Sequence, residues 1–328
     1  MQWRAVSRFL AIVIAATLLP APVLVAAARA DTTAAPEVLQ AEQLYKDGKY
    51  REAIAVLDKY LTAHPQDAAA LVDRGDDFEA LDDEKSAVAD YSAAIQINPL
   101  YAYAYASRCE ARMELGENRA ALEDCNKAIE LQPTLTYAYR MRALTELRGG
   151  DSQAALADAN HALQLSPNSA NALVTRCRAY IALERYKDAL ADCNSAATID
   201  PTNDFAYFYR GRVELIQENW NAAVADFTEA VRLNPTDTNA YYWLAAGQRE
   251  AGQYAEALKN VDLYISQAAD DGDGYYLRAQ IEMKLGNAAE ARSSATNAVR
   301  HYQIDNDNAD AAKAQELLDS LGKASPPP

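Results

Sequence analysis

Apolar residues recur at helical spacing along this chain, in runs that are too short to form a core alone. Between Asn171 and Asn203 two stripes are visible, Ala172, Leu173, Arg176, Cys177 and Tyr180, and then Ala189, Leu190, Cys193, Ala196 and Ala197. This spacing predicts two amphipathic helices. Because neither helix can bury its stripe alone, we expect the two to pack antiparallel across a short turn.

The same pair of helices recurs every 34 residues. Six prolines keep this spacing: Pro65, Pro99, Pro133, Pro167, Pro201 and Pro235. Counting back from each proline gives repeats at 34–67, 68–101, 102–135, 136–169, 170–203 and 204–237. Two weaker copies without the proline follow at 238–271 and 272–305. A proline ends the second helix because it has no backbone N–H to donate.

Small residues complete the motif. The twentieth place of each repeat is alanine, from Ala53 to Ala291, and the eighth place is Gly, Ala or Cys. A 34-residue period with these places resembles the tetratricopeptide repeat. The resemblance implies an all-α, right-handed α–α superhelix of about eight hairpins over 31–305. It also implies a capping helix at 306–322, and we expect a disordered tail at 323–328.

The first thirty residues differ from the rest. Arg4 and Arg8 precede an apolar run, and an A-x-A site ends at Ala30. These features predict a signal peptide cleaved after Ala30, and hence an exported, periplasmic protein. The alternative is a retained membrane anchor, against which Pro20 and Pro22 argue. After cleavage no segment is apolar enough to span a membrane.

The chain is acidic, with a formal net charge of −16. This disfavours nucleic acid as a partner. The three histidines are far apart, and the sequence lacks the motifs of hydrolases, zinc proteases and nucleotide-binding enzymes. We therefore expect no catalytic residue, no cofactor and no metal. Two segments, around Asp271 and Asp305, partly match the pattern of a calcium-binding loop but lack the required ligands. We expect their acids to have turn and helix-capping roles.

Arginine and aspartate alternate in register through repeats two to six. The seventh place is arginine on the first helix, and the twenty-third is aspartate on the second. The pattern predicts the ion pairs Arg74–Asp90, Arg108–Asp124, Arg142–Asp158, Arg176–Asp192 and Arg210–Asp226. The planar guanidinium suits two-point contact with a carboxylate. The alternative is a row of arginines that binds anions.

The four cysteines occupy the eighth and twenty-fourth places of repeats three and five. Each pair has one cysteine on each helix of a hairpin, which favours the disulfides Cys109–Cys125 and Cys177–Cys193 over the other connectivities. An exported compartment permits oxidation. The alternative is four buried thiols.

In proteins that look like this one, first helices line a concave groove that holds a partner peptide. The groove-facing places are acidic in repeats two and three and become aromatic and basic later. The predicted groove residues are Arg140, Arg178, Phe205, Phe208, Arg212, Asn239, Tyr242, Trp243, Arg249 and Tyr276. Aromatic residues and arginine are typical of binding hot spots. Tyrosine at these places is also explained by packing alone.

These patterns predict a non-catalytic scaffold or adaptor in the cell envelope, which binds a peptide or C-terminal segment of another protein. The clamp by which cytosolic relatives bind chaperone tails needs Lys, Asn and Arg where this chain has Val38, Glu42 and Asp73. The alternative function is a receptor for a small ligand or glycan, using the aromatic surface of repeats six to eight.

Overall fold

The structure, a computed structural model, describes residues 35–323. The predicted signal peptide, and all of the predicted tail except Lys323, lie outside these residues. The described backbone forms seventeen helices and no strand. It divides into two compact units. Their boundary, between Asp188 and Ala189, falls within one helix, α11 (Tyr186–Ile199).

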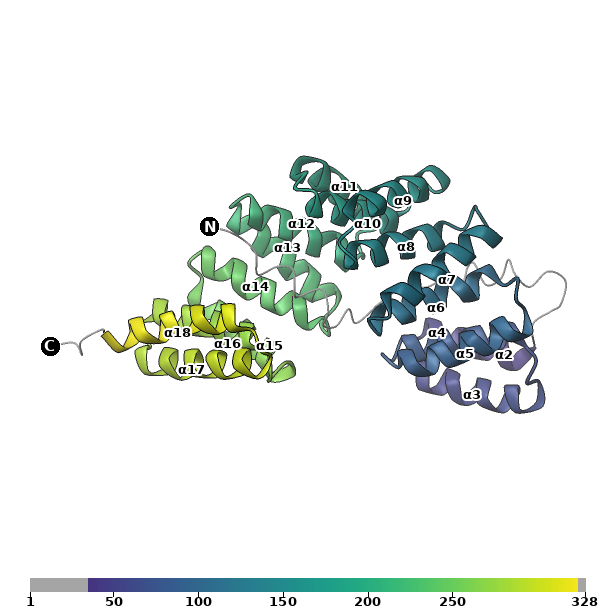
Figure 1. Cartoon of the computed structure of the whole chain (residues 1–328), viewed down its shortest axis with the longest axis horizontal. Coiled ribbons are helices and arrows are strands. Elements are labelled where there is room, and N and C mark those ends of the chain that lie inside the picture. The colour runs from purple at the N-terminus through teal and green to yellow at the C-terminus, as the bar shows by residue number, and fades with distance from the viewer. Residues whose placement is uncertain (1–34, 324–328) are drawn as a thin grey trace. The chain divides into compact units, whose positions relative to one another are not determined.

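The N-terminal unit consists of helical hairpins (Figure 1). Its first helices are α2 (Pro36–Lys46), α4 (Ala68–Glu79), α6 (Ala102–Glu114), α8 (Thr136–Arg148) and α10 (Ala170–Ala182). Its second helices are α3 (Tyr50–Ala63), α5 (Glu84–Ile97), α7 (Asn118–Leu131) and α9 (Ser152–Leu165). Each first helix contacts the next first helix, from α2 to α10, so their side chains form one continuous face.

The C-terminal unit continues the pattern. It holds most of α11, then α12 (Asp204–Ile216), α13 (Trp220–Leu233), α14 (Thr238–Glu250), α15 (Tyr254–Gln267), α16 (Gly272–Leu285), α17 (Ala288–Ile304) and α18 (Asn308–Lys323). From α4 to α16, first helices begin at the first residue of each predicted repeat. Seventeen helices therefore fit about eight hairpins and one further helix. The all-α fold of a repeat solenoid is confirmed.

The turn inside each hairpin depends on one residue with positive φ, again every 34 residues. In five hairpins this residue is glycine, as at Gly116 (φ +77°). In three it is not: Asp82, Glu184 and Glu218 have φ of 57° to 63°. A Cβ atom makes this left-handed conformation costly, so glycine is the residue that fits it best.

The eighth and twenty-fourth places pack directly on each other and share one volume. A Cβ atom on Gly75 would lie 2.5 Å from the ring of Tyr91, and one on Gly211 would lie 3.0 Å from the ring of Phe227. Where the glycine is replaced by Cys109, the aromatic ring is replaced by Cys125. Close approach of the two helices therefore requires a matched pair of side chains at these places.

Helix α18 packs on α17 at the end of the C-terminal unit, and Figure 1 shows the two side by side. Ala311, Ala314 and Leu321 are its buried residues, whereas Ala312 is exposed. The helix thus covers the apolar face that α17 would otherwise leave open. None of the helices in residues 35–323 is long and apolar enough to cross a membrane.

Candidate interaction surface

Four of the five predicted seventh-place arginines hold their twenty-third-place aspartates in two-point contact. Arg74 Nε and Nη2 both donate to Asp90 at 2.7 Å, and Arg210 makes the same two bonds to Asp226 at 2.9 and 2.6 Å. Arg108–Asp124 and Arg142–Asp158 repeat this geometry. These aspartates are buried, and hydrogen bonding to Asp90 raises the pKa of Arg74 above its ordinary value.

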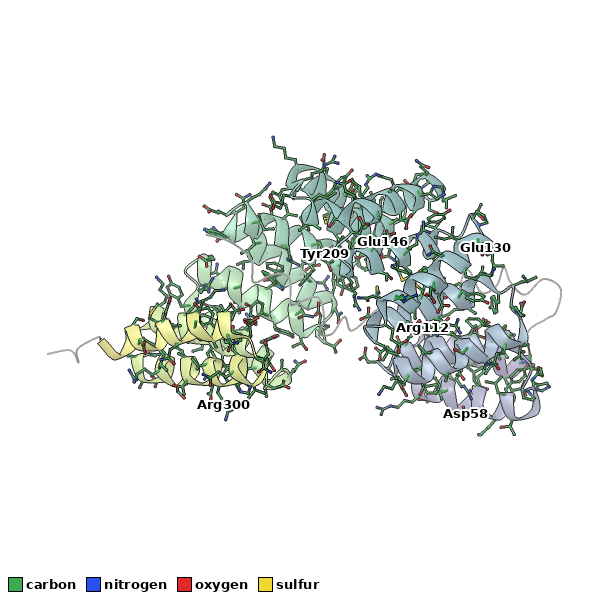
Figure 2. The ribbon with its side chains drawn as sticks, viewed as in Figure 1. Asp58, Arg112, Glu130, Glu146, Tyr209 and Arg300 are labelled. Carbon is green, nitrogen blue, oxygen red and sulfur yellow. A yellow bond between two sulfur atoms is a disulfide. The ribbon has the colours of Figure 1, made fainter. Side chains whose placement is uncertain are left out.

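A third bond from each arginine reaches the preceding hairpin. Nη1 donates to the residue sixteen positions earlier, on the second helix before it. These acceptors are Asp58, Ser92, Asn126, Asn160 and Asn194, bound by Arg74, Arg108, Arg142, Arg176 and Arg210 respectively. Figure 2 labels Asp58 on α3. The repeat pattern did not predict this bond, although a polar residue recurs at the twenty-fifth place. The arginines therefore join neighbouring repeats, and their donors are engaged within the protein.

The cysteines are oxidised. Cys109 and Cys125 form a disulfide with Cα atoms 5.5 Å apart, and both side chains are fully buried. Cys177 and Cys193 are disulfide-bonded too, and the described residues contain no free cysteine. This chemistry is consistent with an oxidising compartment.

Four side chains of the C-terminal unit form what we call the aromatic–arginine face: Phe205, Tyr209, Arg212 and Trp243. The rings of Phe205 and Tyr209 stack with centroids 6.5 Å apart on α12, where Figure 2 labels Tyr209. The guanidinium carbon of Arg212 lies 4.6 Å from the Trp243 ring centroid, in cation–π geometry. All four side chains are partly exposed, so they can contact a partner.

The structure places Phe208 in the core instead of on this face. Its ring is only 8% exposed and packs edge-on against Phe227 and Tyr209. Phe227 fills the space above Gly211, and Phe208 covers the same cluster. Phe208 is therefore unavailable to a partner in this arrangement.

The other predicted groove residues lie on first helices and are partly buried. Tyr242 packs against Trp243 and Tyr264, and burial raises the pKa of its hydroxyl. Arg249 donates to Glu250 and Gln280, and Tyr276 packs beside the core of the last hairpin. Asn239 lies in the first turn of α14 and Arg178 in α10. Arg140 lies 5.4 Å from the Tyr137 ring centroid.

A second group of side chains, in the N-terminal unit, combines acids with tyrosines. We call it the acid–tyrosine cluster: Asp76, Asp77 and Glu79 of α4, Tyr91 of α5, Tyr103 and Glu110 of α6, and Tyr137 of α8. Tyr91 lies 2.7 Å from Asp76 Oδ1 and 2.8 Å from Glu79 Oε2. Tyr103 donates to Asp76, and Tyr137 donates to Glu110.

Burial raises the pKa of every carboxyl group in this cluster. It raises that of Asp77 to about 9, with repulsion from Asp76 and Asp73 adding to the effect. The pKa values of Asp76 and Glu79 rise well above the usual range for the same reasons, whereas Arg140 partly offsets the effect of burial on Glu110. Desolvation disfavours the charged form of an acid, and neighbouring acids disfavour it further.

The turn and capping roles of the acids near the C-terminal end are confirmed. Asp271 caps α16 through the backbone N–H of Asp273. Asp307 accepts from the backbone N–H of Asp310 in the first turn of α18. Within residues 35–323, no three His, Cys, Asp or Glu side chains are arranged to hold a metal ion.

Comparison with known families identifies the repeat. The tetratricopeptide repeat family matches residues 38–102 and 140–204 through one of its sequence profiles, and residues 214–281 through another. These segments together span more than half of the chain, which therefore belongs to the tetratricopeptide repeat family. Its members bind other proteins and are generally non-enzymatic scaffolds. None of the curated proteins matches the chain significantly.

Solved structures share the fold. A chain of the APC/C hetero-tetramer Cut9–Hcn1 matches with a TM-score of 0.73 and 13% identity, covering 87% of this chain and 55% of that one. This chain thus spans about half the length of that relative. A tetratricopeptide repeat protein from Parabacteroides merdae matches with a TM-score of 0.53 and 20% identity, covering 78% and 99%. PilF of Pseudomonas aeruginosa matches with a TM-score of 0.55 and 18% identity, covering 66% and 96%.

Proposed function

We propose that this protein is an exported adaptor that binds a peptide segment of another cell-envelope protein along its first helices. The observation that carries the proposal is the aromatic–arginine face. Phe205, Arg212 and Trp243 come from two consecutive first helices and remain partly exposed. Large rings beside arginine combine apolar contact with a fork of donors, which suits a peptide side chain or terminal carboxylate.

Export to the periplasm is supported by cysteine chemistry. All four cysteines are disulfide-bonded, and disulfides are rare in reducing compartments. The sequence of residues 1–30 adds the features of a signal peptide. Secretion is tested by N-terminal sequencing of protein recovered from the periplasmic fraction, where Asp31 is the expected first residue.

The binding role is tested by crosslinking in cells followed by mass spectrometry. The test variant is Phe205→Ala/Arg212→Ala. The matched control is Leu263→Ala/Arg232→Ala, which removes an exposed apolar residue and an exposed arginine from second helices of the same unit. We expect one envelope protein to be captured by the parent and the control but not by the test variant. Equal capture by all three forms would reject this face as the binding site.

A further inference from the structure

When its carboxyl groups are ionised, the acid–tyrosine cluster has more hydrogen-bond acceptors than donors. Tyr91 lies within bonding distance of both Asp76 and Glu79, but a phenol carries a single proton. Tyr103 donates to the other oxygen of Asp76, so Tyr91 can satisfy either Asp76 Oδ1 or Glu79 Oε2, but not both at once. Its partner oxygens therefore need a further donor.

Two buried oxygen atoms on α4 have no hydrogen-bond donor among residues 35–323. Glu79 Oε1 and Asp77 Oδ1 are both inaccessible and without a hydrogen-bond partner, and Asp77 is only 2% exposed. Burial raises the pKa of the Tyr45 hydroxyl on α2, and the charges of Asp76, Glu79 and Asp77 raise it further. Buried acceptors without partners are costly when the acids are ionised, so a positive charge bound beside them is stabilised.

No lysine or arginine of the described part of the chain neutralises this part of the cluster. Across residues 35–323, neither lysine nor arginine forms an ion pair with Asp76, Asp77 or Glu79. Two arginines of α8 act instead on acids of α6: Arg148 pairs with Glu114, and Arg140 acts on Glu110. The three carboxyl groups on α4 thus form the end of the cluster that lacks positive charge.

The surroundings favour an organic cation as the missing donor. The rings of Tyr103 and Tyr137 stack with centroids 5.5 Å apart beside the carboxyl groups. Arg140 already lies over Tyr137 in cation–π geometry. Carboxylates combined with aromatic faces bind ammonium and guanidinium groups, which carry three and five N–H donors respectively.

We propose that Asp76 and Glu79, which are partly exposed, bind the side-chain cation of a lysine or arginine in a basic segment of a partner protein. This site lies in the N-terminal unit and has the opposite charge preference to the aromatic–arginine face. The proposal rests on the proposed function only in taking the partner to be a protein. The two sites use different residues, so either can fail while the other stands.

Proton exchange supports the assignment. Burial raises the pKa values of these carboxyl groups, so they hold protons that an entering cation displaces. Binding is therefore expected to tighten as pH rises from 6 to 8. The titratable and charged groups facing the site are Tyr45 on α2, Asp73 on α4, Tyr91 on α5, Tyr103, Glu110 and Glu114 on α6, and Tyr137, Arg140 and Arg148 on α8.

The test measures binding of a fluorescent, end-blocked peptide of alternating lysine and glycine to the full chain. The test variant is Asp76→Asn/Glu79→Gln, whose amide oxygens still accept from Tyr91. The matched control is Glu52→Gln/Glu123→Gln, which changes the formal charge equally at exposed positions of the same unit. Circular dichroism and thermal unfolding verify that both variants fold. Glu110→Gln serves as a second test variant if the first does not fold.

We expect the test variant to bind at least about tenfold more weakly than the parent, and the control to remain within about twofold. A peptide of alternating glutamate and glycine is expected not to bind. Equal weakening in the test and control variants would show general charge attraction and overturn the proposal. Binding of spermidine but not of the lysine peptide, with the same dependence on Asp76 and Glu79, would overturn the peptide assignment in favour of a free polyamine.

Discussion

Arg210 reaches Asn194 across the boundary between two hairpins. Its Nη1 donates to Asn194 Oδ1 at 3.0 Å, while Nε and Nη2 hold Asp226 of its own hairpin. One side chain thus fixes the spacing of the two helices in a hairpin and the position of that hairpin on the preceding one. The planar guanidinium makes this possible because its donors point in fixed directions.

Replacing Arg210 by methionine is expected to destabilise the protein by about 3 kcal/mol, because Asp226 would remain buried without its partner. The double variant Arg210→Met/Asp226→Leu should recover most of that loss, since no buried charge remains. Urea unfolding monitored by circular dichroism measures both. If the double variant is less stable than Arg210→Met, the ion pair contributes more to the free energy of unfolding than two apolar side chains in its place.

The bond between hairpins can be tested separately. Asn126→Ala removes the acceptor of Arg142 Nη1 and should cost about 1 kcal/mol. Thr228→Ala is the matched control: Thr228 occupies the same place, but the next repeat has Leu244 where the others have arginine. The control should change the free energy of unfolding by less than about 0.5 kcal/mol. Equal effects would contradict a role for the bond in stability.

Removing the disulfide of the third hairpin should weaken the protein without changing its fold. The Cys109→Ala/Cys125→Ala variant copies the fourth hairpin, which has Ala143 and Ala159 at these places. Because the disulfide closes a loop of sixteen residues, its loss is expected to cost about 3 kcal/mol. Thermal unfolding of parent and variant gives the difference. If the midpoints agree, the disulfide contributes nothing measurable.

Substituting glycine at a turn residue with positive φ is expected to raise the stability of the protein. Glu218 adopts φ +63°, where a Cβ atom is unfavourable. Glu218→Gly is therefore expected to stabilise the protein by up to about 1 kcal/mol, and Gly116→Ala to destabilise it by a similar amount. Chemical denaturation checks both changes. A loss of stability in Glu218→Gly would mean that the glutamate side chain stabilises its turn by more than the strain costs.

Asp77 should make stability depend on pH in an unusual direction. Its pKa rises from about 4 in the unfolded chain to about 9 in the folded protein, so the folded state binds more protons between these values. The contribution of Asp77 is therefore complete below pH 4 and is lost as pH rises towards 9, by about 1 kcal/mol per pH unit.

Asp77→Asn is expected to remove this dependence and to stabilise the protein most at pH 8. Unfolding free energies of parent and variant at pH 5, 6, 7 and 8 provide the measurement. Asp47→Asn, at an exposed position in the same unit, controls for the change of charge. A difference between Asp77→Asn and the parent that stays constant with pH would contradict the assignment.

The sequence predicted the repeat and its hairpins because prolines, alanines and stripes recur at one period. It did not predict the positive φ in the turn of each hairpin. Glycine would have indicated this conformation, but three of the turns have Asp82, Glu184 and Glu218 at this place. The third arginine bond escaped notice because its acceptors vary among Asp, Ser and Asn and share only polarity. A repeat pattern in the sequence does not reveal a hydrogen bond when side chains of several types can accept it.

The surfaces were harder to predict than the helices. Phe205 and Phe208 are both aromatic and lie three residues apart, yet one is partly exposed and the other is buried against Phe227. Their difference depends on packing between helices, which spacing along one helix does not contain. Likewise, the sequence predicted acidic groove-facing places in repeats two and three, and only the structure reveals that Asp77 is buried and that its Oδ1 has no hydrogen-bond partner among the described residues.

The bond from each arginine to the preceding hairpin has a consequence for how the number of repeats increases by duplication. The segments LEDCN at 122–126 and LADCN at 190–194 lie 68 residues apart, the length of two repeats. A duplicated two-repeat block carries its own arginine at the front and its own polar acceptor at the rear. Each new junction then finds donor and acceptor already in register, as Arg142 finds Asn126 and Arg210 finds Asn194. Copying alone would therefore lengthen the array, with no compensating substitution needed at the joint.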